Sequence, residues 1–382
     1  MQDYPVELLQ RMLEVYSPSG SESELAKVLC EEMRSNGMKS KIDPAGNVVG
    51  TLGSEGIRIL LCGHMDTVPG RIPVRVEDDF LYGRGSVDAK ASLAAMIIGA
   101  TLGMKRSTLP LQITVAGVVE EETTSRGIRA LMEEVTPFDL AVFGEPSGVN
   151  NIIVGYKGSL KLHLTFHTKT GHSAAPWLST SSYEESTSYW TSFQREFLDN
   201  SAQSKFDAVT GCVTNISSNG PGNSVPAETT LDVDIRIPPT SKSQDVANAI
   251  RKFTSDLSNE NKNVTIELQI DDATDAFLGS TASYVVSAFR WAIRKVRGGQ
   301  VALLKKTGTG DINLFAEAQK IPMFAYGPGE SRLDHTETEH VSISEYMASI
   351  EVYAHALPRI AERASESELV SAPVEQRSRA KT

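Results

Sequence analysis

The stretch Leu60-Leu61-Cys62-Gly63-His64-Met65-Asp66-Thr67-Val68-Pro69 joins an apolar run to a pair of polar side chains. Residues 57–61 are mostly apolar and are bounded by glycines, which is typical of a short buried strand. If the extended backbone continues through His64 and Asp66, their side chains leave the same face of the strand. The carboxylate can then reach the ring nitrogen that a metal-bound imidazole leaves free. The pair alone fits a metal site and a solvated loop equally well.

Other predicted strands also end in acidic residues. Residues 111–119 form an apolar, β-branched run followed by Glu120-Glu121-Glu122, and residues 140–143 run into Gly144-Glu145-Pro146-Ser147. Three adjacent carboxylates repel one another unless a cation or bound protons offset their charge. Because ligands gather at the ends of strands in α/β sheets, the positions of these acids favour a site over a solvated charge run.

Asp88 and His335 are the remaining candidates. Asp88 stands directly before a helix predicted over residues 89–103, where a carboxylate can cap the first turn as readily as it can bind a metal. His335, in Leu333-Asp334-His335-Thr336, follows a strand predicted at residues 322–326, which would complete the sheet. A lone histidine in a loop usually has no special role, so its position after this strand is what makes it a candidate.

The combined donors are two imidazoles and several carboxylates, which suit zinc or a similar ion without any cysteine. Five ligands are too many for one catalytic ion, but they fit two ions that share a bridging carboxylate. A further acid, at position 120 or 121, would take a proton from water and return it to the leaving amine. The predicted chemistry is hydrolysis of an amide or peptide bond. Ser/His/Asp catalysis is the competing idea, but no GxSxG motif accompanies these histidines.

Composition excludes several classes of protein. The net charge of −11 argues against non-specific binding to nucleic acid, which requires a basic face. The three cysteines of the 382 residues lie far apart and form no disulfide framework, so a reducing cytoplasm is expected. The first residues carry acids and no apolar signal core. The longest apolar stretch, residues 93–104, is too short to span a bilayer, so no membrane association is expected.

The pattern of elements predicts an α/β protein with two domains. A mixed-sheet catalytic domain with helices on both faces is expected at residues 1–155 and 274–363. It is interrupted at residues 156–273 by a smaller α+β domain, where residues 161–167 alternate as a half-exposed antiparallel strand should. Residues 364–382, rich in Ser, Glu and basic residues, are expected to form a disordered tail.

With these motifs assembled, the chain resembles the co-catalytic zinc deacylase and exopeptidase family, which includes acetylornithine deacetylase, succinyl-diaminopimelate desuccinylase and carboxypeptidase G. The resemblance covers nearly everything before the tail. It implies two divalent ions, zinc first and cobalt as the alternative, and a cis peptide bond from Asp88 to Ala89. It implies Asp66 as the partner that orients a ligand imidazole and Glu121 as the general base, with Glu120 standing where the family usually has Asp. The metal ligands that it implies are His64, Asp88 (bridging), Glu122, Glu145 and His335.

The family resemblance also gives the inserted domain a role as a lid and a dimerisation domain, and it implies a homodimer. His172, in Gly-His-Ser-Ala-Ala-Pro, matches a histidine that reaches the active site of a neighbouring subunit and stabilises the oxyanion. Asn223 and Arg236 match residues that hold the free carboxylate of the substrate, which arginine can do with two parallel hydrogen bonds. Without the family context, an exposed loop histidine and a surface ion pair would be the better interpretations.

Several further stretches, such as Gly155-Tyr156-Lys157-Gly158 and Ala325-Tyr326-Gly327-Pro328-Gly329, are similar to one branch of the family. Its members release lysine or ornithine from the amino-group carrier protein LysW, by cleaving the amide at the carrier's C-terminal glutamate. Gly310 departs from the branch pattern, which usually has Ser before Asp311, so the choice between lysine and ornithine stays open. Two alternatives remain: a hydrolase of a small free substrate such as acetylornithine, and an inactive binding protein. The second predicts a missing ligand or base, and none is missing.

Overall fold

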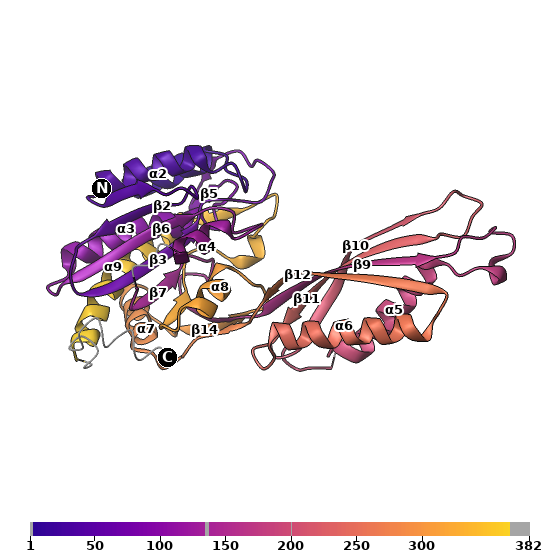
Figure 1. The fold of residues 1–382 in the computed structure, drawn as a ribbon. Coiled ribbons are helices and arrows are strands. Elements are labelled where there is room, and N and C mark those ends of the chain that lie inside the picture. The colour runs from indigo at the N-terminus through magenta and orange to yellow at the C-terminus, as the bar shows by residue number, and fades with distance from the viewer. Residues whose placement is uncertain (1–2, 134–136, 200, 367–382) are drawn as a thin grey trace. The chain divides into compact units, whose positions relative to one another are not determined.

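The computed structural model describes residues 3–133, 137–199 and 201–366, and the chain forms two compact units (Figure 1). The first unit comprises residues 3–154, 279–304 and 314–366, and the second comprises residues 155–278 and 305–313. Relative to the predicted boundaries, the second unit gains residue 155, residues 274–278 and the segment 305–313. The segment 305–313 is held to the second unit by two hydrogen bonds, because Thr309 Oγ1 and Asn313 Nδ2 both donate to the carbonyl oxygen of Lys157.

The first unit is built on a mixed sheet. Among the described residues the sheet has nine strands, in the order β1-β2-β6-β3-β7-β15-β8-β13, and β14 also pairs with β8. β3 runs parallel to both β6 and β7, and β15 runs parallel to β7, whereas β1 and β2 are antiparallel to their neighbours. The strands are β1 (Lys39–Ile42), β2 (Val48–Leu52), β3 (Ile57–His64), β6 (Leu111–Val118), β7 (Leu140–Phe143), β8 (Asn151–Tyr156), β13 (Phe277–Leu278), β14 (Ala302–Lys306) and β15 (Met323–Ala325). By the division given above, β13 and the last two residues of β8 and of β14 are counted in the second unit.

The central strands are buried along nearly their whole length, as expected for strands covered on both faces. The helices are α1 (Asp3–Glu14), α2 (Ser23–Ser35), α3 (Lys90–Arg106), α4 (Arg126–Glu133), α7 (Tyr284–Arg297), α8 (Asp311–Ala318) and α9 (Ile343–Glu366). α3 packs closely on α9, and a Cβ added at Gly99 would lie 2.4 Å from the Cβ of Tyr353. These contacts agree with the predicted α/β class and with the predicted buried helix after Asp88.

A small antiparallel sheet lies beside the loop that carries His335. It consists of β4 (Arg75–Glu77), β5 (Phe80–Tyr82) and β16 (His340–Ser342), in the order β16-β5-β4. β4 and β5 form an antiparallel hairpin. A short 3₁₀ helix, η2 (Ser331–Leu333), precedes His335.

The second unit has its own antiparallel sheet and its own core. The strand order is β10-β11-β9-β12, with β9 (Gly158–Thr168), β10 (Thr210–Asn219), β11 (Glu228–Ile237) and β12 (Val264–Thr274). Helices α5 (Ser182–Phe197) and α6 (Ser243–Glu260) cover one face, while the 3₁₀ helix η1 (Pro176–Leu178) is exposed. The alternation predicted for residues 161–167 is confirmed by β9. The sequence prediction missed β12, whose polar residues and terminal acids hide its alternation.

The end of α9 corrects the predicted tail. The sequence prediction starts a disordered segment at residue 364, but α9 continues to Glu366. The reason is that Ile360, Ala361 and Ala364 extend the apolar face of the helix into the core of the first unit. Residues 367–382, the rest of the predicted tail, lie outside the described residues. Across residues 3–366, apart from the gaps named above, no helix has both the length and the apolar character needed to cross a membrane.

Candidate metal centre

The candidate ligands lie at one edge of the first unit's sheet, where its parallel strands end. His64 is the last residue of β3, Glu122 follows β6, Glu145 follows β7, and His335 lies in the loop after β15. These four strands are neighbours in the order β6-β3-β7-β15. Because parallel strands present their carboxyl ends at the same edge, residues far apart in the sequence converge there. Asp88 joins them from the turn before α3.

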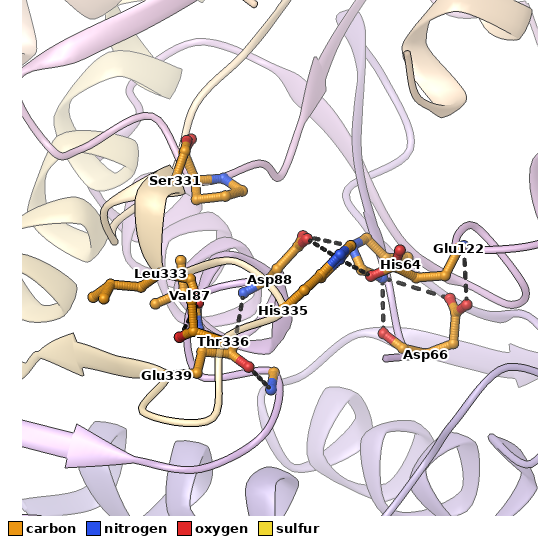
Figure 2. Close-up of polar contacts among 12 residues, drawn as sticks. His64, Asp66, Val87, Asp88, Glu122, Ser331, Leu333, His335, Thr336 and Glu339 are labelled. Atoms are coloured by element: carbon orange, nitrogen blue, oxygen red, sulfur yellow. Dashed lines mark hydrogen bonds and ion pairs between the residues drawn. The ribbon is translucent and has the colours of Figure 1, made fainter. Parts of the chain in front are cut away.

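The carboxylate of Asp88 contacts both imidazoles (Figure 2). Its Oδ1 is 3.2 Å from Nε2 of His64, and its Oδ2 is 3.2 Å from Nε2 of His335. His335 Nε2 is also 2.9 Å from Oε1 of Glu122. Asp88, Glu122 and His335 each offer a ligand atom, and these atoms lie within 4.8 Å of one another. One carboxylate oxygen toward each ring is the arrangement that a bridging ligand requires.

The backbone and the carboxylate of Asp66 organise two of these ligands. His64 Nδ1 lies 2.9 Å from the carbonyl oxygen of Asp66 and 3.5 Å from its carboxylate, so the backbone contact is the closer one. Since a carbonyl oxygen only accepts, Nδ1 carries the proton and Nε2 is left to bind a metal. The buried carboxylate of Asp66 meanwhile accepts the backbone N–H groups of Glu121 and Glu122, at 3.0 and 3.1 Å, and the hydroxyl of Ser19 at 2.7 Å.

The electrostatics of the cluster favour bound positive charge. Hydrogen bonds to Asp88 and Glu122 raise the pKa of His335 to about 10. Burial would lower the pKa of His64, but hydrogen bonds to Asp66 and Asp88, together with the negative charges of Asp88 and Glu121, raise it well above its ordinary value. Protons on the imidazoles therefore offset the carboxylates, and divalent cations would offset the same charge. This donor set fits a metal centre, and no thiolate is needed.

The structure distinguishes the two glutamates that precede Glu122. Glu120 has a φ of 58° and its carboxylate pairs with Arg126 at 2.7 Å, and the hydrogen bond from Arg126 lowers the pKa of Glu120. Its side chain is thus held by Arg126 and by Thr124. The backbone N–H of Glu121, in contrast, is fixed by Asp66, and the charge of Glu121 acts on His64. Of the two alternatives from the sequence, this geometry favours Glu121 as the base.

Hydrogen bonds fasten the loop of His335 to the segment that carries Glu145. Ser147 Oγ donates to the carbonyl oxygen of Gly327, and the hydroxyl of Ser331 donates to the carbonyl oxygen of Pro146. Glu145 itself lies outside the group of three residues whose ligand atoms converge. The peptide bond from Asp88 to Ala89 is cis, as the family resemblance implies.

The remaining predicted site residues belong to the second unit, where they lie at two ends of its sheet. His172 follows β9 and bridges to Ser224, and Ser173 N–H donates to the carbonyl oxygen of Asn223. Arg236 lies near the other end of β11, opposite Ser159 at the start of β9. It makes two hydrogen bonds to Asp234, at 2.7 and 2.9 Å, and one to Thr309. The structure therefore brings His172 and Asn223 together and places Arg236 apart from them.

Two contributing residues escaped the sequence reasoning. Ser19 donates to Asp66, and Glu339 accepts the backbone N–H groups of the turn that carries Asp88. Neither residue belongs to a motif or follows a strand end. A buried glutamate four residues after His335 looks the same in the sequence as its exposed neighbour Glu337.

A set of imidazoles and carboxylates around an aspartate that contacts two imidazoles, at the open edge of a mixed α/β sheet, is typical of a metal-dependent amide hydrolase. Residues 60–359 match the family model described as peptidase family M20/M25/M40. The chain belongs to peptidase family M20/M25/M40, which confirms the family expected from the sequence motifs.

Named relatives cover nearly the whole chain. A protein of Pyrococcus abyssi, provisionally named a LysW-lysine/LysW-ornithine hydrolase, is 35% identical over 363 residues, or 94% of each chain. The LysW-lysine hydrolase of Deinococcus radiodurans is 34% identical over 362 residues, covering 93% of this chain and 96% of that protein. The YXEP protein of Bacillus subtilis, a dinuclear metal-binding peptidase of family M20, has a TM-score of 0.72 at 15% identity, covering 94% of this chain and 98% of that one. This last likeness shows the fold alone.

Proposed function

We propose that this enzyme hydrolyses the amide between the C-terminal glutamate of the carrier protein LysW and lysine or ornithine. The observation that carries the hydrolytic part is the Asp88 carboxylate, with one oxygen directed at each of two imidazoles. The carrier part is supported by relatives of matching length that are named for LysW-linked substrates. The reaction places the enzyme in lysine or arginine biosynthesis.

His64, Asp88, Glu122, Glu145 and His335 are the proposed ligands of two divalent ions, with zinc favoured over cobalt by the donor set. When bound, the ions would polarise the amide carbonyl and lower the pKa of an attacking water molecule. The protein's own groups orient the ligands and transfer the proton. The carbonyl oxygen of Asp66 orients His64, and the Asp66 carboxylate holds the backbone at Glu121. Glu121 accepts the proton of the water on a carboxylate oxygen and transfers it to the leaving α-amine.

We also propose a homodimer, because one chain cannot bring all the predicted substrate contacts together. β11 has ten residues, and at roughly 3.3 Å per residue it is about 30 Å long. Asn223 and His172 lie beyond one end of it, and Arg236 lies near the other. A small substrate carboxylate cannot touch both ends, so His172 and Asn223 would act on the site of the partner subunit. The exposed edge strand β10 offers unpaired backbone groups for such a contact.

The cytoplasm is the compartment that we propose. Cys30, Cys62 and Cys212 form no disulfide with one another, and Cys212 is exposed, as expected of a protein from a reducing environment.

The proposed substrate is tested by offering the purified, zinc-loaded enzyme three substrates at equal concentration. These are LysW carrying lysine, LysW carrying ornithine, and free N-acetylornithine, with release of the free amino acid measured by chromatography. We expect turnover of at least one loaded carrier and little turnover of N-acetylornithine. Turnover of N-acetylornithine alone would replace the proposal with a deacetylase of small free substrates.

A further inference from the structure

Glu339 is a buried carboxylate with an unusual set of partners, because three of its four hydrogen bonds come from the backbone of a single turn. Its Oε1 accepts the N–H groups of Val87 and Asp88, at 2.8 and 3.1 Å. Its Oε2 accepts the N–H of Gly85 at 3.1 Å and the guanidinium of Arg84 at 2.9 Å. The residue is 1% exposed. Figure 2 shows its carboxylate beneath the segment that leads to Asp88.

The turn that Glu339 holds determines where the Asp88 carboxylate points. Two of its contacts fix the peptide groups on the N-terminal side of Val87 and Asp88, and those groups set the direction of the Asp88 side chain. The turn is tight, since Gly85 has a φ of 86° and a Cβ there would lie 2.8 Å from Cγ2 of Thr67. A small rotation of this backbone would move the carboxylate away from one imidazole or the other.

Glu339 also ties this turn to the loop that carries His335. It lies four residues after His335, and its own carbonyl oxygen accepts the N–H of Gly83 at 3.3 Å. Asp88 and His335 face each other at 3.2 Å, but they come from segments about 250 residues apart in the sequence. Glu339 is therefore a direct link, through the protein, between the two segments that meet at the centre.

Fold stability gives little reason for a charged group at this position. The carboxylate of Glu339 is removed from water, which costs free energy that its hydrogen bonds to the N–H groups and to Arg84 offset. A buried ion pair is often no more stabilising than apolar residues of the same size, so its advantage is a defined geometry. The geometry that Glu339 defines is that of Asp88.

We propose that Glu339 is a positioning residue that holds Asp88 and His335 at the separation needed to bind the metal ions. This inference rests on the proposed ligand set. The partners that orient metal ligands typically contribute about 10- to 100-fold in metal affinity. Glu339 acts less directly, because it holds the backbone of the turn that carries Asp88 rather than the Asp88 side chain.

The test measures zinc affinity by competition with a chromophoric chelator, and zinc content by mass spectrometry, in Glu339→Gln and Glu339→Ala. Glutamine keeps one acceptor oxygen but places an NH₂ group against donors, so it should weaken zinc binding, and alanine should weaken it further. We expect losses of roughly 10-fold and 100-fold.

Asp139→Asn is the matched control. Asp139 also accepts a backbone N–H and pairs with an arginine, both from Arg58, at the start of β3 and thus at the opposite end of that strand from His64. The Asp139→Asn variant should melt at a lower temperature than the wild type yet bind zinc with wild-type affinity. If the Glu339 variants behaved in the same way, with lower melting temperatures and unchanged zinc affinity, the residue would be structural only and the inference would be wrong.

A measurement on the wild type covers the case in which neither variant folds. If Glu339 preorganises the turn, the amides of Val87 and Asp88 should exchange hydrogen slowly in the metal-free protein as well as in the zinc-loaded one. Fast exchange that slows only with zinc would mean that the metal orders the turn, against the inference. Failure of the wild type to bind zinc would instead overturn the proposed ligand set.

Discussion

The placement of His172 in the active site of a partner subunit can be tested with mixed dimers. One subunit carries Glu121→Ala, which removes the proposed base but leaves the second unit intact. The other carries His172→Ala, which leaves the metal centre intact. The two chains are co-expressed with different affinity tags, and two successive purifications give the mixed dimer free of both parents.

The expected magnitude follows from the geometry of the second unit. His172 lies beyond one end of β11, a strand about 30 Å long, while Arg236 lies near the other end. If His172 acts on the partner, one site of the mixed dimer has an intact base and an intact histidine, and the other has neither. The mixed dimer should then show about half of the wild-type turnover, whereas both parents are nearly inactive.

A crossed control gives the opposite result. Here both substitutions lie on one chain, and the partner chain is wild type. Action on the partner predicts an almost inactive dimer, because the only intact base faces the altered histidine. Action within one chain predicts half activity for this control and almost none for the first mixed dimer. That reversed pattern, or a monomer by light scattering, would refute the proposed exchange of residues.

Two further predictions concern the metal centre and the core of the second unit. Glu121→Gln should keep its metal content while turnover falls by about 10²- to 10⁴-fold, whereas His64→Ala should lose bound metal as well as turnover. Metal analysis and steady-state rates, measured on both variants, separate the two effects. An unchanged kcat in Glu121→Gln would refute the assigned base. Lys157 is fully buried and donates to Lys205 O, Ala208 O and Thr210 Oγ1, and burial lowers its pKa from 10.5 to about 8. The unfolded chain therefore binds more protons than the folded chain between pH 8 and 10.5, and this residue makes the protein more stable as the pH rises through that window, by at most about 1.4 kcal/mol per pH unit. Lys157→Met should be less stable at every pH, because three acceptors lose their donor, and its free energy of unfolding should lack this pH dependence. The free energy of unfolding of both proteins is measured by urea denaturation at several pH values from 8 to 10. The same change with pH in both proteins would contradict the prediction.

The sequence revealed those parts of the site that follow from regular structure. Apolar runs such as residues 57–61 and 140–143 predict buried strands, and the residue after a strand end has a predictable place at the edge of the sheet. His64, Glu122 and Glu145 became candidates in this way, and the structure places each of them where its strand ends. Asp88 became a candidate less directly, since capping and metal binding predict the same residue type before a helix.

The contacts that hold the loops in place could not be predicted in the same way. Hydrogen bonds from a side chain to the backbone have no period in the sequence, so Ser19 and Glu339 look like ordinary polar residues. The segment 305–313 was assigned to the catalytic domain for the same reason, because its membership of the second unit depends on Thr309 and Asn313 donating to a single carbonyl oxygen. Sequence distance carries no information about such bonds.

Asp66 and Glu339 make the same hydrogen-bonding arrangement at two places in the protein. Each is a buried carboxylate that accepts two successive backbone N–H groups, from Glu121 and Glu122 in one case and from Val87 and Asp88 in the other. In both pairs the second residue is a proposed metal ligand. Loops beyond a sheet edge lack ladder hydrogen bonds, so the direction of a ligand carboxylate must be fixed by other acceptors. A carboxylate suits this role because charged acceptors make the stronger hydrogen bonds, at a cost in burial that the backbone donors offset.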